Sequence, residues 1–175
     1  MELGPYKLIK ERDLTPRIDG QPVRFEALFN PVRMSLVKDE VNRLGFKKAG
    51  IYLWTVVIQN NNYKLYVGKA ARQNGNGLGR LLEYLKPFQL NSPNDFKIQH
   101  FDDYMERNES TDVLYQLYYY EYDATSVRAL THLEKELREK LKPVFGNDRM
   151  PKRRVPELHA LYQQIWDDYF DSKLK

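Results

Sequence analysis

Residues 50–70 read Gly-Ile-Tyr-Leu-Trp-Thr-Val-Val-Ile-Gln-Asn-Asn-Asn-Tyr-Lys-Leu-Tyr-Val-Gly-Lys-Ala, and this stretch decides the fold. Residues 50–58 are mostly β-branched or aromatic, which predicts a buried strand. The three asparagines at 60–62 predict a turn, and residues 63–69 predict a second strand that returns beside the first. The stretch therefore predicts an antiparallel hairpin whose loop is slightly longer than the tightest type.

The chain after the hairpin alternates helical patterns with one more strand. Residues 113–122 are rich in tyrosine and predict a third strand. A glycine-rich loop over residues 70–79 precedes the first helical pattern. Helices are predicted at about 78–86, 95–108, 125–141 and 156–170. The order β-β-α-α-β-α predicts an α+β fold with a small antiparallel three-stranded sheet flanked by helices.

The chain before the hairpin has no clear hydrophobic period and carries four prolines. We expect an extended arm with a turn at residues 18–21, then a short helix from about Pro31 to Leu44. The predicted division has three parts. These are an N-terminal arm with a short helix (1–47), a core (48–148), and a basic linker with a C-terminal helix (149–175).

Composition excludes several classes of site. The 175 residues include no cysteine, so disulfides, thiolate nucleophiles and cysteine-based zinc sites are excluded. The three histidines are far apart in sequence, so a bound metal would be held by carboxylate and water, which favours Mg²⁺ or Mn²⁺. No apolar run approaches the length of a membrane span, and the N-terminal residues lack the layout of a signal peptide. We therefore expect a cytoplasmic protein.

The positive charge of the chain is clustered. The net charge of +4 is mild and by itself fits a solvated basic surface equally well. The clusters are Arg43/Lys47/Lys48, Lys64/Lys69/Arg72/Arg80 and Arg149/Lys152/Arg153/Arg154. Clustered cations interleaved with tyrosine and asparagine suit a polyanionic backbone, so DNA is the predicted partner.

The hairpin carries side chains suited to phosphodiester hydrolysis. That reaction needs a nucleophile in line, neutralisation of phosphoryl charge and help for the leaving oxygen. A neutral tyrosine is a poor base because its reference pKa is about 10, and a nearby cation or metal favours the phenolate. Tyr52 and Tyr66 lie on paired strands, with Lys69 three residues after Tyr66. These residues could occupy such a setting, although strand tyrosines are often only part of a core.

The same hairpin resembles the GIY-YIG nuclease superfamily. Gly50-Ile51-Tyr52 matches the first motif and Tyr66-Val67-Gly68 the second. Lys69-Ala70 continues as in the amino-terminal nuclease domain of the bacterial excision-repair incision protein. The resemblance covers about residues 48–148.

Four later residues extend the resemblance. Arg80, followed four residues later by Tyr84, matches the family's arginine and the tyrosine or histidine after it. Glu134 precedes Pro143 by nine residues, as the family's metal-binding glutamate precedes its proline. Asn147 is one residue further on than the family's late asparagine.

The resemblance implies a metal-dependent DNA endonuclease. Glu134 would hold Mg²⁺ or Mn²⁺, Tyr52 would orient or deprotonate the attacking water, and Tyr66 and Lys69 would adjust Tyr52 and position that water. The layout of this chain is most similar to that of type II restriction enzymes of the family. The alternatives are a structure-specific repair nuclease and a non-catalytic nucleic-acid-binding protein with the same fold.

The resemblance gives the remaining residues a part in holding the phosphate. Arg80 would neutralise it, while Tyr84 and Asn147 would support the geometry. The loop between Lys69 and Arg80 is longer than the family's usual connection, so Arg72 competes with Arg80 for this role. One such site cuts one strand at a time, so double-strand cleavage implies a homodimer or higher homo-oligomer.

Overall fold

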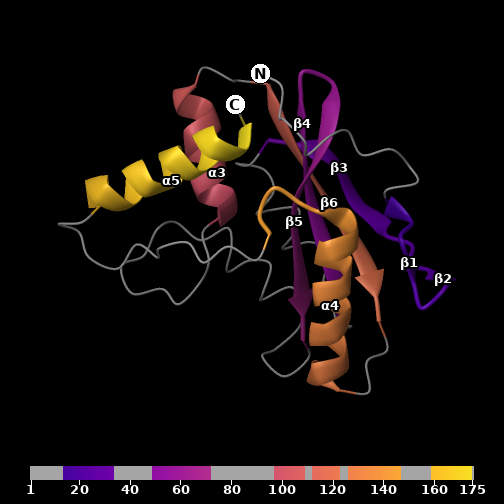
Figure 1. The fold of residues 1–175 in the computed structure, drawn as a ribbon. Helices are drawn as coiled ribbons and strands as arrows, with labels where there is room; N and C mark the ends of the chain where they lie inside the picture. Colours follow the sequence, from indigo (N-terminus) through magenta and orange to yellow (C-terminus); the bar gives the residue numbers. More distant parts are fainter. Residues whose placement is uncertain are drawn as a thin grey trace.

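An antiparallel β-sheet is the centre of the computed structural model. The structure describes residues 14–33, 49–71, 97–108, 112–122, 126–146 and 159–174. Within these residues the sheet has four strands, in the spatial order β3 (Glu26–Val32), β6 (Val113–Glu121), β4 (Gly50–Ile58) and β5 (Asn61–Ala70) (Figure 1). The described helices are α3 (Lys97–Arg107), α4 (Val127–Leu141) and α5 (His159–Leu174). The predicted α+β class is confirmed.

The predicted hairpin is β4 and β5, but its turn is tighter than expected. β4 ends at Ile58 and β5 begins at Asn61. Gln59 and Asn60 connect them, with φ angles of 48° and 65°. Two-residue hairpin turns require this conformation because it matches the twist of the flanking strands. The prediction of a longer loop is wrong, since Asn61 and Asn62 pair with β4 and do not extend the turn.

The fourth strand, β3, corrects the expectation of a three-stranded sheet. It pairs antiparallel with β6, with Glu26 opposite Tyr119, and its register shifts on both sides of Phe29. Such irregularities break the alternation of side chains that marks a strand in a sequence. The helix expected from about Pro31 begins inside this strand, so its start is wrong, and residues 34–48 lie outside the described part of the chain.

The turn predicted near the N-terminus is confirmed. The two-residue strands β1 (Arg17–Ile18) and β2 (Gln21–Pro22) pair antiparallel. Asp19 and Gly20 connect them with φ angles of 50° and 77°. Aspartate and glycine tolerate this left-handed region better than other residues do, which explains why the chain reverses here.

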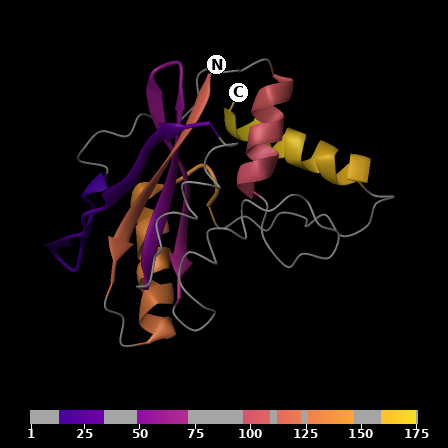
Figure 2. The ribbon, with the colours of Figure 1, turned by 180° about the vertical axis from the view of Figure 1, so that it is seen from behind.

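Helices cover both faces of the sheet. α4 packs on one face through four buried leucines that recur at helical spacing: Leu130, Leu133, Leu137 and Leu141. They pack against strand residues whose side chains lie on the α4 face of the sheet: Ile51, Leu53 and Val67. α3 and α5 lie over the opposite face, where Figures 1 and 2 show them crossing each other beside the strands.

The bounds of α4 follow from its caps. The side chain of Ser126 accepts a hydrogen bond from the amide of Ala129 at 3.2 Å, which satisfies one of the amides left open at the helix start. Lys142 adopts a left-handed conformation and its amide bonds the carbonyl of Arg138. Pro143 follows and cannot continue the helix. The predicted helix over 125–141 is confirmed, with a start two residues later.

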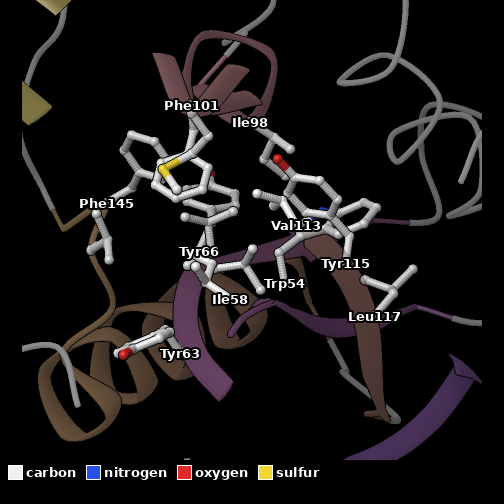
Figure 3. Close-up of a cluster of buried hydrophobic side chains, with 14 of the residues drawn as sticks. Trp54, Ile58, Tyr63, Tyr66, Ile98, Phe101, Val113, Tyr115, Leu117 and Phe145 are labelled. Atoms are coloured by element: carbon white, nitrogen blue, oxygen red, sulfur yellow. The ribbon is translucent and has the colours of Figure 1, made fainter. Parts of the chain in front are cut away.

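The face under α3 and α5 holds an aromatic core. Figure 3 shows Tyr66 and Trp54 on the side of the strands that faces Phe101 of α3, with Leu117 farther along, beside β6. α5 adds Phe170, whose ring lies 5.6 Å from that of Phe101. Side chains of α3 and α5 therefore belong to the same core as the hairpin. The helices predicted over 95–108 and 156–170 are confirmed as α3 and α5, whereas the helix expected at 78–86 lies outside the described residues.

Trp166 of α5 tests whether the C-terminal helix is part of that core. It is 2% exposed and its ring stacks on His100 of α3 at 4.4 Å. We expect Trp166→Ala to lower the free energy of unfolding by about 3–5 kcal/mol, because it removes a large buried side chain and leaves a cavity. Urea unfolding measures this change. Leu161→Ala on the same helix is the control, since Leu161 is 54% exposed and should cost less than about 1 kcal/mol. Equal losses in both variants would contradict the observed packing.

The division into arm, core and C-terminal helix stays a prediction. β3 lies before residue 48 and α5 lies after residue 148, yet β3 completes the sheet and α5 contributes to its core. None of the helices in the described ranges is long and apolar enough to cross a membrane.

Candidate active site

The candidate site is built around four consecutive residues of β5, Tyr66-Val67-Gly68-Lys69. Among the strands that the structure describes, β5 is at the edge of the sheet, with β4 as its one strand neighbour. Phe145, which follows α4, bonds the carbonyl of Leu65 through its amide at 3.0 Å and so covers part of this edge. The side chains of α4 reach the residues immediately beyond that point.

Lys69 and Glu134 meet across β5 and α4. The Lys69 Nζ lies 3.1 Å from Oε2 of Glu134. The same ammonium donates a hydrogen bond to Oγ1 of Thr131 at 2.8 Å. Thr131 is about one helical turn before Glu134, so both side chains project from the same face of α4. Two residues chosen from the sequence, 65 positions apart in the chain, are thus in direct contact.

Arg138 of α4 connects Glu134 with Tyr66, whose side chain belongs to the aromatic core on the other face of the sheet. Its Nη2 donates to Oε1 of Glu134 at 2.8 Å and to the Tyr66 hydroxyl at 3.0 Å. Its Nε donates to the carbonyl of Val67 at 3.0 Å. The guanidinium carbon also lies 5.2 Å from the centre of the Tyr66 ring. One arginine therefore connects the Tyr66 phenol, the β5 backbone and the Glu134 carboxylate.

Sequence reasoning did not single out Arg138. Its signal in the sequence is the spacing of four residues from Glu134, which places the two side chains side by side on a helix. That spacing is common on solvated helices and by itself does not indicate a site. Only the packing of α4 against β5 makes this pair part of the cluster.

Tyr52 enters the site from the opposite face of the sheet. It belongs to the aromatic core, is fully buried, and its hydroxyl is buried as well. Its ring lies over Gly68, its partner in the β4–β5 register. A Cβ placed at Gly68 would lie 2.3 Å from Cζ and from the hydroxyl oxygen of Tyr52. The Tyr52 and Tyr66 rings are 6.2 Å apart. Tyr52 thus contacts the site through Gly68 and Tyr66.

The glycine of the first motif has a comparable packing reason. A Cβ at Gly50 would lie 2.3 Å from the carbonyl oxygen of Tyr120 and 2.5 Å from the ring of Tyr119. Both residues belong to β6, which pairs with β4 along its whole length. Gly50 therefore lets β6 and its tyrosines approach the start of β4.

Several other tyrosines are unsuited to act as bases. Desolvation by burial is the largest cause that raises the pKa of each of four of them: Tyr104, Tyr115, Tyr118 and Tyr119. Tyr115 also donates a hydrogen bond to Asp102 at 2.5 Å, and the negative charge of that carboxylate raises its pKa further. A phenol with a raised pKa stays protonated at neutral pH. These four residues are structural members of the sheet and of α3.

The charges of the site are two cations and one carboxylate. Lys69, Arg138 and Glu134 are all partly buried, with side-chain exposures of 29%, 19% and 13%. Charge-assisted hydrogen bonds are the stronger class, and partial burial reduces their screening by solvent. The cluster as described has an excess of positive charge, which suits a phosphate group.

A divalent ion could bind at this cluster with Glu134 as its one ligand from the described residues. No group of three or more His, Cys, Asp or Glu side chains within the described residues could hold a metal. An ion would therefore rely on Glu134, with water and substrate oxygens as further ligands, which Mg²⁺ accepts. An ionised carboxylate has about four acceptor positions, and the contacts with Lys69 and Arg138 use one on each oxygen. The donor chemistry fits a hard ion, while the two neighbouring cations oppose its binding.

Four residues named from the sequence are not located. Arg72, Arg80, Tyr84 and Asn147 lie outside the described residues. The structure thus brings Tyr66, Lys69 and Glu134 into one network and places Tyr52 beside it. The roles assigned to all eight residues stay predictions. No protein-family model, curated protein or solved structure matches the chain.

Proposed function

We propose that this protein is a metal-dependent DNA endonuclease of the GIY-YIG type. The observation that carries the proposal is the network in which Lys69 and Arg138 hold Glu134, and Arg138 holds the Tyr66 hydroxyl. Tyr66 and Lys69 lie on one strand, so the supporting contact is the one that brings Glu134 of α4, named from its motif position, to Lys69. The positive excess of the cluster suits the phosphodiester backbone.

Each residue has one part in the proposed reaction. Glu134 would hold Mg²⁺ or Mn²⁺, and the bound ion would supply charge neutralisation at the scissile phosphate and the leaving oxygen. The resemblance would have Tyr52 orient or deprotonate the attacking water, and Tyr66 and Lys69 adjust Tyr52 and position that water. This role requires water to reach the Tyr52 hydroxyl, which is buried on the sheet face opposite Glu134. Arg80 neutralises a phosphoryl oxygen.

Within this class we propose a type II restriction endonuclease, with a structure-specific repair nuclease as the alternative. The support is the resemblance of residues 48–148, to whose sheet and core β3 and α5 contribute a strand and a helix. A single site of this kind cuts one strand, so we also propose that the protein acts on duplex DNA as a homodimer or a higher homo-oligomer.

Plasmid cleavage tests the proposal. Purified protein is incubated with supercoiled plasmid and Mg²⁺ or Mn²⁺, and the cut ends are sequenced. We expect cleavage that depends on the divalent ion and is lost in Glu134→Ala and Arg80→Ala. Recurrent ends at one sequence favour a restriction enzyme, and scattered nicks favour a repair or degradative nuclease. Undiminished cutting by both variants would refute the assignment of the site.

A second candidate is a nucleic-acid-binding protein without catalysis. The observation that favours it is that Lys69 and Arg138 already neutralise both oxygens of Glu134. In this candidate the carboxylate serves to fix two phosphate-binding cations and holds no metal ion. This candidate predicts DNA binding that weakens with salt and no cleavage with any divalent ion.

A further inference from the structure

We infer that Arg138 is a positioning residue that fixes Tyr66 and Glu134 relative to each other and competes with a divalent ion for the Glu134 carboxylate. This inference rests on the proposed function, because it concerns the same site. Neither motif of the resemblance includes Arg138, so the inference comes from the contacts of this chain alone.

The positioning part follows from the way the guanidinium is held. Its Nε is fixed by the backbone carbonyl of Val67, which belongs to a paired strand and cannot rotate away as a side chain can. Its Nη2 then donates to both the Tyr66 hydroxyl and Glu134 Oε1. Because the guanidinium is planar and rigid, fixing Nε also fixes the direction of Nη2. The phenol and the carboxylate therefore share one nitrogen whose place is set by β5.

The competing part follows from charge. Arg138 and Glu134 are one helical turn apart on α4, and their contact at 2.8 Å occupies Oε1. A divalent ion that binds the same carboxylate is repelled by the guanidinium, and the repulsion is strengthened by the partial burial of both side chains. Lys69 makes a similar contact with the other oxygen. Metal binding at Glu134 thus requires that a cation gives way or that an incoming phosphate offsets the repulsion.

These two parts predict opposite effects on metal binding and on turnover. Removing the charge of Arg138 should strengthen metal binding, because one repelling cation is lost. Removing its planar guanidinium should slow turnover, because Tyr66 and Glu134 are then no longer fixed relative to each other. A residue with a purely structural role would weaken both together.

Two substitutions separate charge from geometry. Arg138→Met keeps most of the stem and removes both the charge and the donors. Arg138→Lys keeps the charge and loses the planar fork. The matched control is Lys135→Met, which removes one positive charge from the exposed side of the same helix, where Lys135 contacts Glu139 at 3.9 Å.

The readouts are the Mn²⁺ dissociation constant from calorimetry without DNA, and kcat and KM for plasmid cleavage. We expect Arg138→Met to bind Mn²⁺ about tenfold more tightly and to lose about 100-fold in kcat. We expect Arg138→Lys to bind Mn²⁺ like the unsubstituted protein and to lose about tenfold in kcat. Lys135→Met should leave both readouts unchanged. Circular dichroism checks that each variant is folded, and Arg138→Lys decides the kcat prediction if Arg138→Met does not fold.

Two results overturn the inference while leaving the proposed function in place. These are Mn²⁺ binding by Arg138→Met that is unchanged or weaker, and a kcat for Arg138→Lys equal to that of the unsubstituted protein. If the unsubstituted protein cuts no DNA, the proposed function fails. The Mn²⁺ titration then still decides the competing part, since an unchanged dissociation constant overturns it.

Discussion

Glu134→Gln is expected to lower the rate of DNA cleavage by at least about 1000-fold. Glutamine has nearly the same volume as glutamate, so the helix and the leucine face of α4 are preserved. It has no negative charge, so it can neither hold a divalent ion nor balance Lys69 and Arg138, which contact the two Glu134 oxygens. The loss should appear in kcat, because the interaction is made with the charge that develops during the reaction.

Single-turnover cleavage of a radiolabelled duplex, with and without Mg²⁺, measures this loss. Glu136→Gln is the matched control, because Glu136 lies on the same helix and contacts His132 at 3.5 Å, outside the cluster. We expect the control to retain cleavage within about twofold, as surface substitutions away from a site have small effects. A Glu134→Gln enzyme that cuts at the unsubstituted rate would remove Glu134 from the mechanism.

Gly68→Ala is expected to lower both the stability of the protein and its rate of DNA cleavage. The new methyl group would lie 2.3 Å from two atoms of Tyr52, which no real side-chain contact allows. Tyr52 is fully buried in the aromatic core, so its ring cannot move without displacing neighbours such as Tyr66. We expect a loss of about 1–3 kcal/mol in the free energy of unfolding, the usual cost of overpacking. Cleavage should fall as well, because Tyr52 and Tyr66 are both displaced.

A double-mutant cycle with Tyr52→Ala isolates the cause. Urea unfolding is measured for the two single variants and for the double variant. If the cost of Gly68→Ala arises from Tyr52, it should nearly disappear once the ring is removed, which gives a coupling energy well above the additivity error of about 0.5 kcal/mol. Additive losses would mean that the methyl group is accommodated elsewhere. The clash with Tyr52 would then not be the reason that position 68 requires glycine.

The elements predicted most accurately are those with a local pattern. The leucines of α4 recur at the helical period, and the end of the helix is marked by Pro143. β4 is a continuous run of β-branched and aromatic residues, and every residue of it but Val57 is buried. Such patterns depend only on neighbouring residues, so a single sequence contains them. β3 has no such pattern, because its register shifts twice along β6.

The candidate site divides in the same way. Tyr66, Lys69 and Glu134 could be named from the sequence because they stand at motif positions. Arg138 could not, because a Glu and an Arg four residues apart occur on many exposed helices. Its importance appears only when α4 docks on β5 and the guanidinium reaches the carbonyl of Val67.

The sequence by itself determined the hairpin, the helix α4 and the identity of three side chains that meet at the edge of β5. The tertiary structure alone decided that β3 completes the sheet, that Tyr52 lies on the face opposite Glu134, and that Arg138 connects Tyr66 to that carboxylate. The physical reason is the range of the interactions. Secondary structure follows from side chains a few positions apart, whereas strand order and helix docking depend on contacts between residues that are distant in the chain.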